Sequence, residues 1–427
     1  MDYLLKNGHI YVNGEFFDGD ILLQNGCISA LGVDLSADNA TVLDLQGKLV
    51  TPGLVDLHVH FRDPGQTVKE TIATGSRAAA RGGFTTVAAM PNVDPVPDNA
   101  ARIKHMLDRN AQEAVVHVKQ YSSITINRAA GDCVDFAAVK AAGAVAVSND
   151  GNGIQSAKTM WEALLGCKAA GLPLAEHIEE DSLKDGGVMT AGKRAQELGL
   201  PGAPTVVETS QLGRDLALAK AAGAHYHACH VSTADSIKMV RAAKADGVQV
   251  TAEATPHHLL LADSDIPDNQ DTNFKMNPPL RSAADRDALV QALADGTIDI
   301  VATDHAPHTA DEKAAGFCGA PNGITGSETC FAALYTDLVL TGKLPLTRLL
   351  DVLTSAPARI FELDCGHILP GGAADIAVFD LAHAETVRAA DFASKGKNSP
   401  WVGRELRGNC YCTFVDGKLV YKQEEKA

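Results

Sequence analysis

The chain has 427 residues, of which 45% are hydrophobic and 21% are charged, as is typical of a globular protein with a substantial core. The 53 acidic residues outnumber the 37 Lys and Arg residues and give a formal charge of −16. This balance argues against nucleic acid or an anionic membrane as a partner, because both require a basic face. No run reaches the ~18 apolar residues that a membrane span needs. Nine cysteines without a regular spacing predict free thiols in a cytoplasmic protein.

Both ends of the chain predict short strands that are broken by tight turns. Four turn pairs typical of β-hairpins occur there: Asn7-Gly8, Asn13-Gly14, Asn25-Gly26 and Asp416-Gly417. Neither end is long enough to bury a core of its own. We therefore expect residues 1–50 and 363–427 to pair and form one small β-sandwich domain.

Residues 51–362 alternate short apolar runs with helical stretches. The eight strand candidates are Leu54–His60, Phe84–Met90, Val115–Gln120, Ala144–Asn149, Pro173–His177, His225–His230, Gln249–Ala254 and Ile298–Asp304. Helices with apolar residues at helical spacing are expected between them, among them Val68–Arg81, Lys158–Ala170, Ala234–Ala245 and Ala284–Ala294. Repeated strand–helix units imply parallel strands with right-handed crossovers. Eight such units predict an α/β fold, a closed (β/α)8 barrel of the TIM type.

The first barrel strand carries a pair of histidines at its end. His58 and His60 are two residues apart, so their side chains leave a strand on the same face. Two converging imidazoles suit a zinc-type ion. A His-x-His pair by itself also fits an ordinary half-buried strand, so the interpretation depends on further ligands at other strand ends.

Four later strand candidates also end in His or Asp, at the barrel face where catalytic groups collect. These residues are Asp150, His177, His230 and Asp304. Together with the histidine pair they could hold two four-coordinate ions that share a carboxylate. Asp150 is the natural bridge. The other ligands would divide into His58, His60 and Asp304 on one ion, and His177 and His230 on the other.

Several neighbouring residues are expected to lie outside the metal site. His225 and His227 share a strand with His230, but alternation puts His227 on a different face. Glu179 is expected on a solvated loop face. The stretch Thr309–Gly323 is rich in Gly and Ala and is expected to form a mobile loop over the site.

Several segments resemble the signatures of dihydroorotases of the long bacterial type, in the amidohydrolase superfamily. The matching segments are His58–Gly65, Met90–Asn92, Lys275–Arg281, Asp304–His308, Gly326–Thr329 and Pro370–Asp375. They occur in the family's order and span nearly the whole chain. The resemblance therefore concerns the complete barrel and its flanking sheet, not one isolated motif.

The resemblance implies a zinc enzyme with two ions per subunit, which interconverts N-carbamoyl-L-aspartate and (S)-dihydroorotate in UMP synthesis. Metal-bound hydroxide would attack the ring amide, since metal ions lower the pKa of bound water toward ~7. Asp304 would be both a ligand and the general acid/base. Substrate contacts carried over from the family are His60, Arg62, Asn92, Asn277, His308, Asn322 and Gly323. The resemblance also implies a homodimer and leaves room for an association with aspartate transcarbamoylase.

Two alternatives stand beside this interpretation. An allantoinase or hydantoinase would share the barrel, but such relatives commonly bridge their metals with a carboxylated lysine, where this chain has Asp150. A non-catalytic homologue that serves as a scaffold for aspartate transcarbamoylase would have lost metal ligands, and this sequence keeps all six. The family's Pro-Phe-Gly stands here as Pro321-Asn322-Gly323, so a substrate contact through the aromatic ring is not available.

Overall fold

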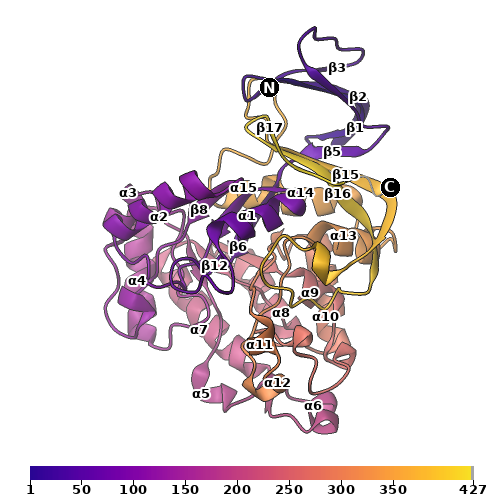
Figure 1. The fold of residues 1–427 in the computed structure, drawn as a ribbon. Coiled ribbons are helices and arrows are strands. Elements are labelled where there is room, and N and C mark those ends of the chain that lie inside the picture. Colours follow the sequence, from indigo (N-terminus) through magenta and orange to yellow (C-terminus); the bar gives the residue numbers. More distant parts are fainter. Residues whose placement is uncertain (425–427) are drawn as a thin grey trace.

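The computed structural model describes residues 1–424 and consists of a β-sheet region beside a larger barrel. Figure 1 shows the indigo N-terminal strands and the yellow C-terminal strands meeting at one end of the molecule, with the helices gathered around the barrel below them. The two ends of the chain therefore lie together, as the sequence predicted.

The sheet region is built from eight strands contributed by both chain ends. They are β1 (Tyr3–Val12), β2 (Glu15–Gln24), β3 (Cys27–Gly32), β4 (Thr41–Asp44), β5 (Leu49–Pro52), β15 (Ile376–Thr386), β16 (Glu405–Val415) and β17 (Lys418–Lys422). Their order is β17-β16-β15-β5-β1-β2-β3, with β4 beside β1. The two chain ends join where β5 pairs antiparallel with β15, with Val50 opposite Val378.

The sheet folds over on itself to form the expected sandwich. Two strands separate β1 from β16, which in a flat sheet would place them about 14 Å apart. The rings of Tyr3 in β1 and Phe414 in β16 nevertheless lie 5.0 Å apart. A separate apolar core fills the fold and includes Leu5, Ile21 and Ile376, which are fully buried.

Three of the four predicted hairpin turns are confirmed. Asn13-Gly14, Asn25-Gly26 and Asp416-Gly417 connect successive antiparallel strands, and both residues of each pair have positive φ, as such turns require. The fourth prediction is wrong, because Asn7-Gly8 lies inside β1 at a register shift. Close packing explains this glycine, since a Cβ at Gly8 would lie 2.8 Å from the side chain of Val50.

The barrel is closed, and seven of its eight predicted strands are regular. These are β6 (Leu54–Val59), β7 (Phe84–Ala89), β8 (His117–Gln120), β9 (Leu174–Glu176), β12 (Tyr226–Ala228), β13 (Val250–Ala254) and β14 (Ile300–Val301). The predicted strand Ala144–Asn149 is reduced to single parallel bridges from Val147 to Ser122 and Leu174. A bridge between Val59 and His305 closes the ring. The segment that precedes Asp150 is therefore the least regular of the eight strand positions of the barrel.

Helices cover the outside of the barrel. The main ones are α1 (Ile72–Arg81), α2 (Ala100–Glu113), α3 (Phe136–Ala141), α4 (Ala157–Ala170), α7 (Val206–Ala222), α8 (Ala234–Ala245), α10 (Ala283–Asp295), α13 (Cys330–Leu334), α14 (Leu346–Leu353) and α15 (Ser355–Ile360). The loops add α5 (Asp181–Lys184), α6 (Lys193–Leu198), α9 (Pro256–Leu260), α11 (Ala310–Lys313), α12 (Gly316–Gly319) and the short pair β10 (Met189–Thr190) and β11 (Gly202–Ala203). No helix of residues 1–424 is long and apolar enough to span a membrane.

Helix boundaries follow local capping chemistry. α1 begins four residues later than predicted, because Thr71 and Thr74 form a capping box there. Gly171 and Gly296 end α4 and α10 in the left-handed conformation, which glycine adopts most easily.

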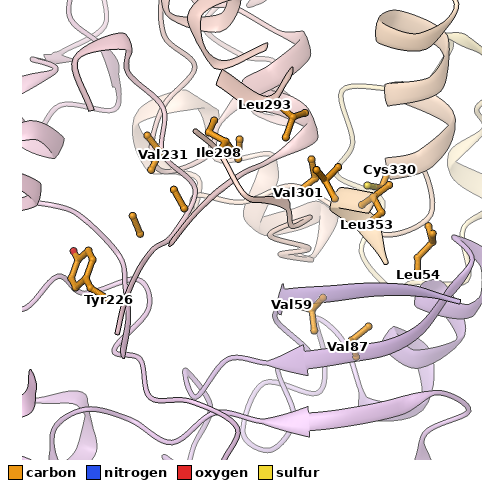
Figure 2. Close-up of a cluster of buried hydrophobic side chains, with 14 of the residues drawn as sticks. Leu54, Val59, Val87, Tyr226, Val231, Leu293, Ile298, Val301, Cys330 and Leu353 are labelled. Atoms are coloured by element: carbon orange, nitrogen blue, oxygen red, sulfur yellow. The ribbon is translucent and has the colours of Figure 1, made fainter. Parts of the chain in front are cut away.

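The main apolar core lies between the strands and the helices. Figure 2 shows Leu54, Val59 and Val301 on barrel strands facing Leu293 of α10 and Leu353 of α14. All five side chains are almost completely buried. This layer fixes the outer faces of the strands, so that the polar groups at their carboxyl ends are held over the mouth of the barrel.

Candidate active site

Five segments of the barrel bring the six predicted ligands into one buried cluster. His58 lies in β6 and His60 follows it. The other four come directly after the barrel staves, and all six are at most 7% exposed. Asp56 ties two of these segments together, because it accepts hydrogen bonds from the Thr303 hydroxyl at 2.5 Å and from the backbone N–H of His58 at 3.1 Å.

Three residues of the site adopt the left-handed backbone conformation. φ is 58° at Arg62, 32° at His230 and 49° at Asp304. A non-glycine residue held in this region costs about 1–3 kcal/mol. The packed barrel holds these conformations, which aim the three side chains into the mouth instead of along the strand direction.

The first half of the cluster combines two imidazoles with two carboxylates. His60 Nε2 lies 2.9 Å from Asp304 Oδ1 and 3.4 Å from Asp150 Oδ2. His58 Nε2 lies 3.2 Å from Asp150 Oδ1 and 3.5 Å from Asp304 Oδ1. Two donor atoms on one tetrahedral zinc ion stand about 3.3 Å apart, so these four residues are spaced like the ligands of one ion.

The second half of the cluster meets the first at Asp150. His177 Nδ1 lies 3.0 Å from His230 Nε2, and these atoms are 3.7 and 3.5 Å from Asp150 Oδ1. One oxygen of Asp150 thus faces His60 while the other faces His58, His177 and His230. Asp150 therefore contacts ligands of both halves of the cluster.

Unpaired polar atoms in the cluster also fit a metal site. His58 Nε2 and Asp150 Oδ1 are buried and have no hydrogen-bond partner within residues 1–424, although unpaired buried polar atoms are costly. Burial raises the pKa of Asp304, but the hydrogen bond with His60 and the charge of the neighbouring imidazoles outweigh it, so the pKa lies below the ordinary value. The donor set is therefore anionic and suited to divalent metal ions.

Two imidazoles of the cluster, those of His60 and His177, are held from behind by a second polar group. His60 Nδ1 lies 2.8 Å from Asn92 Oδ1. His177 Nε2 lies 2.9 Å from Glu179 Oε2. The expectation that Glu179 is solvated is wrong, because it is 6% exposed and pairs with both His177 and Lys184. Such partners fix the tautomer and the orientation of a metal-binding histidine.

Arg128 holds the backbone of the segment that carries Asp150, and it was not found from the sequence. Its guanidinium donates to the backbone carbonyls of Asn149, at 3.3 Å, and Asp150. The Asn149 side chain in turn accepts from the N–H of Ile124 at 2.9 Å. These contacts replace the missing strand ladder on the stave that carries Asp150. No sequence motif marks Arg128, because its acceptors are backbone atoms.

A cavity of about 180 Å3 opens over the cluster. Every predicted metal or substrate residue except His58 lines it: His60, Arg62, Asn92, Asp150, His177, His230, Asn277, Asp304, His308, Asn322 and Gly323. Gly151 and Ala306 complete the lining. Larger cavities of about 550 and 630 Å3 contain none of these residues. The structure therefore brings the predicted site together in one place.

Arg62 provides the positive charge on one wall of this cavity. It is 7% exposed, and its Nε lies 3.4 Å from the carbonyl of Pro307. Burial and the charge of Arg62 lower the pKa of His308 to about 3, so the neutral ring donates from Nε2 to the carbonyl of Asn322 at 2.8 Å. The guanidinium of Arg62 thus keeps most of its donors available for a ligand.

The predicted loop Thr309–Gly323 contains two short helices, α11 and α12, and is tied down from inside. Lys313 is 7% exposed, and its ammonium donates to the carbonyls of Lys275, Pro321 and Gly323 at 3.3, 3.2 and 3.0 Å. Gly323 has a φ of 128°, and a Cβ there would lie 2.7 Å from that of Ala306. The wall that carries Asn322 and Gly323 therefore has a defined conformation.

Comparison with known proteins was made on both sequence and fold. The family described as Dihydro-orotase-like matches residues 47–236. The chain is 53% identical over 427 residues to the protein named Dihydroorotase of Lactobacillus leichmannii, and 54% identical over 434 residues to that of Lactiplantibacillus plantarum. Both matches cover all of this chain and all of the relative.

Solved structures share the fold. The L-hydantoinase (dihydropyrimidinase) from Arthrobacter aurescens superposes with a TM-score of 0.88 at 27% identity, over 99% of this chain and 97% of that one. The dihydropyrimidinase from Brevibacillus agri NCHU1002 gives 0.87 at 24% identity, over 99% and 95%. At such identity the second likeness supports the fold alone.

Fold and site together place the chain among the amidohydrolases, enzymes whose barrel and flanking β-sandwich carry His and Asp clusters suited to metal ions. Within this class, the fold neighbours are more distant in sequence than the full-length relatives, which share about half of their residues with this chain. The chain belongs to the dihydroorotase family.

Proposed function

We propose that this chain is a dihydroorotase that interconverts N-carbamoyl-L-aspartate and (S)-dihydroorotate in the synthesis of UMP. The observation that carries the proposal is a buried arginine beside a His/Asp cluster that is spaced for two ions. The substrate combines a carboxylate with a cyclic amide, and this cavity offers a partner for each group. Full-length relatives named dihydroorotase support the same assignment.

We assign two zinc ions to the cluster. His58, His60, Asp150 and Asp304 would hold the first, and Asp150, His177 and His230 the second. Zinc in such a site supplies Lewis acidity, which activates water at neutral pH and polarises an amide carbonyl. Four imidazoles and two carboxylates form a donor set of the kind that zinc prefers.

Asp304 is proposed as the general acid/base. Its carboxylate is ionised at neutral pH, because the neighbouring imidazoles lower its pKa. In the hydrolytic direction one carboxylate oxygen would take the proton of the attacking water and deliver it to the leaving amide nitrogen. In the cyclising direction it would accept the proton of the ureido nitrogen. Proton transfer of this kind contributes about 10²–10⁴-fold to the rate.

Arg62 and Asn92 are proposed to anchor the substrate carboxylate. The guanidinium fork of Arg62 matches a carboxylate with two parallel N–H donors. Asn92 uses its carbonyl oxygen on His60, so its amide N–H groups remain for the substrate. Asn277, His308, Asn322 and Gly323 would complete the walls around the ring.

The proposal is tested by turnover and metal content on the purified protein. We expect turnover of dihydroorotate and carbamoyl-aspartate, loss of both activities after chelation, and recovery with zinc at about two ions per chain by elemental analysis. Turnover of hydantoin or allantoin without turnover of dihydroorotate would reverse the assignment to the hydantoinase type of the fold neighbours. A protein that stays free of metal with added zinc would favour the scaffold alternative.

Two further proposals concern assembly and compartment. The family resemblance is the ground for a homodimer and for an association with aspartate transcarbamoylase, which analytical ultracentrifugation of the single and mixed proteins would detect. All nine cysteines are free, five of them buried, and this supports a cytoplasmic location, where thiols stay reduced. Fractionation of cells that express the chain would test the location.

A further inference from the structure

A buried carboxylate links both halves of the metal cluster and is not one of its predicted ligands. Glu253 lies in β13 and is fully buried. Its Oε1 lies 2.6 Å from His58 Nδ1 and accepts a hydrogen bond from the backbone N–H of His230 at 3.1 Å. Glu253 thus contacts one ligand of each proposed ion, from the side opposite the cavity.

The contacts continue from Glu253 through the interior of the barrel. Glu253 Oε2 lies 3.1 Å from His227 Nε2, and His227 Nδ1 lies 2.8 Å from Thr251 Oγ1. The same hydroxyl lies 2.8 Å from His225 Nε2. Thr251 and His225 line the cavity of about 550 Å3 at the starts of β9, β12 and β13. An unbroken chain of polar contacts therefore runs from the metal cluster to the opposite mouth of the barrel.

One arrangement of protons satisfies the whole chain when the imidazoles are neutral. A carboxylate only accepts, so His58 Nδ1 and His227 Nε2 must both carry a proton for Glu253. The other nitrogen of His227 must then accept, and the hydroxyl of Thr251 donates to it. The oxygen of Thr251 accepts in turn from His225 Nε2. Burial and the neighbouring His227 lower the pKa of His225 to about 4, which agrees with a neutral ring.

This arrangement leaves a single state for His58. With its proton on Nδ1, the lone pair of Nε2 points at Asp150 and Asp304, 3.2 and 3.5 Å away. That is the tautomer that binds a metal ion. The balance of charge also favours a further carboxylate beside the ligands, because two divalent ions would carry four positive charges while Asp150 and Asp304 supply two negative ones. Glu253 adds a third carboxylate within 2.6 Å of a ligand.

We propose that Glu253, His227, Thr251 and His225 form a positioning relay that keeps a proton on Nδ1 of His58, so that Nε2 is left to face the metal, and that the relay thereby raises the affinity of the site for zinc. The proposal rests on the proposed metal function. This role agrees with the prediction from the sequence that His225 and His227 are not metal ligands. None of these four residues is assigned a contact with substrate.

The test compares zinc affinity of apo protein variants by competition with a chromophoric chelator. We expect Glu253→Gln to weaken zinc binding by about 10- to 100-fold. Thr251→Val keeps the shape of the side chain, breaks the relay away from the metal cluster, and should weaken binding by a smaller factor, about two- to tenfold. Thr85→Val is the matched control, because the buried hydroxyl of Thr85 has no partner among residues 1–424, and its zinc affinity should be unchanged.

A measurement on the unmutated, metal-free protein tests the proposal even if the variants do not fold. Histidine labelled with 15N reports by NMR which ring nitrogen carries the proton, and we expect His58 to carry it on Nδ1. A His58 ring without a proton on Nδ1, or an unchanged zinc affinity in both Glu253→Gln and Thr251→Val, would overturn the relay while leaving the metal site intact. Failure of the wild-type protein to bind zinc would instead overturn the proposed function itself.

Discussion

Replacement of Arg62 by Met tests the carboxylate anchor most directly. The guanidinium makes a long native hydrogen bond, 3.4 Å from Nε to the carbonyl of Pro307, so the fold loses little. The free energy of substrate binding would fall much more, because removing one partner of a buried ion pair costs about 3–5 kcal/mol. At about 1.4 kcal/mol per factor of ten, this predicts about a 140- to 3,700-fold lower kcat/KM. Arg62→Lys keeps the charge but loses one of the two parallel donors. That loss costs about 1.5–3 kcal/mol of binding free energy, which is about a 10- to 150-fold lower kcat/KM.

The assay measures kcat and KM in both directions, together with the zinc content and Tm of each variant. We expect the loss mainly in KM, because an anchor acts on substrate and transition state alike. Arg241→Met is a suitable control, since Arg241 is half-exposed on α8 and pairs with Asp295. An unchanged KM in Arg62→Met, with metal content intact, would refute the anchoring role.

Three other substitutions probe different parts of the structure. Asp304→Asn should lower kcat by about 10²–10⁴-fold with a nearly unchanged Tm, and an active variant would remove Asp304 from proton transfer. Lys313→Met leaves three carbonyls without their donor, so we expect a KM raised about tenfold and faster proteolysis near Asn322. Unchanged kinetics would contradict the role of Lys313 in holding this loop. His117 has a pKa above its ordinary 6.5, chiefly through its hydrogen bond with Asp375. Because the folded pKa is raised, this pair stabilises the protein fully below pH 6.5 and less as pH rises through the folded pKa. His117→Gln should therefore lower Tm at pH 6 but not at pH 9, and an equal loss at both would refute the ion pair.

The sequence alone predicted most of the elements and the series of His and Asp residues that the barrel brings together. The spacing of apolar residues predicted the strands and helices of a closed barrel, and turn pairs such as Asn13-Gly14 predicted hairpins, because these signals are local in the chain. The ligand series was readable for a related reason: a parallel barrel puts the carboxyl end of every strand at one mouth. The longest helix, α7, was missed because its buried face carries Glu208, Gln211 and Asp215, which interrupt the apolar period.

The groups that hold the site in place could only be found in the tertiary structure. Glu253 lies 195 positions after His58 and Arg128 lies 22 before Asp150, and neither belongs to a motif. Glu179 looked like part of an acidic surface run, yet it is buried against His177. Such contacts depend on distances between strands that are remote in sequence and, for Arg128, on backbone acceptors that every residue possesses. A sequence pattern reports side-chain type and spacing along the chain, whereas these partners are selected by packing in three dimensions.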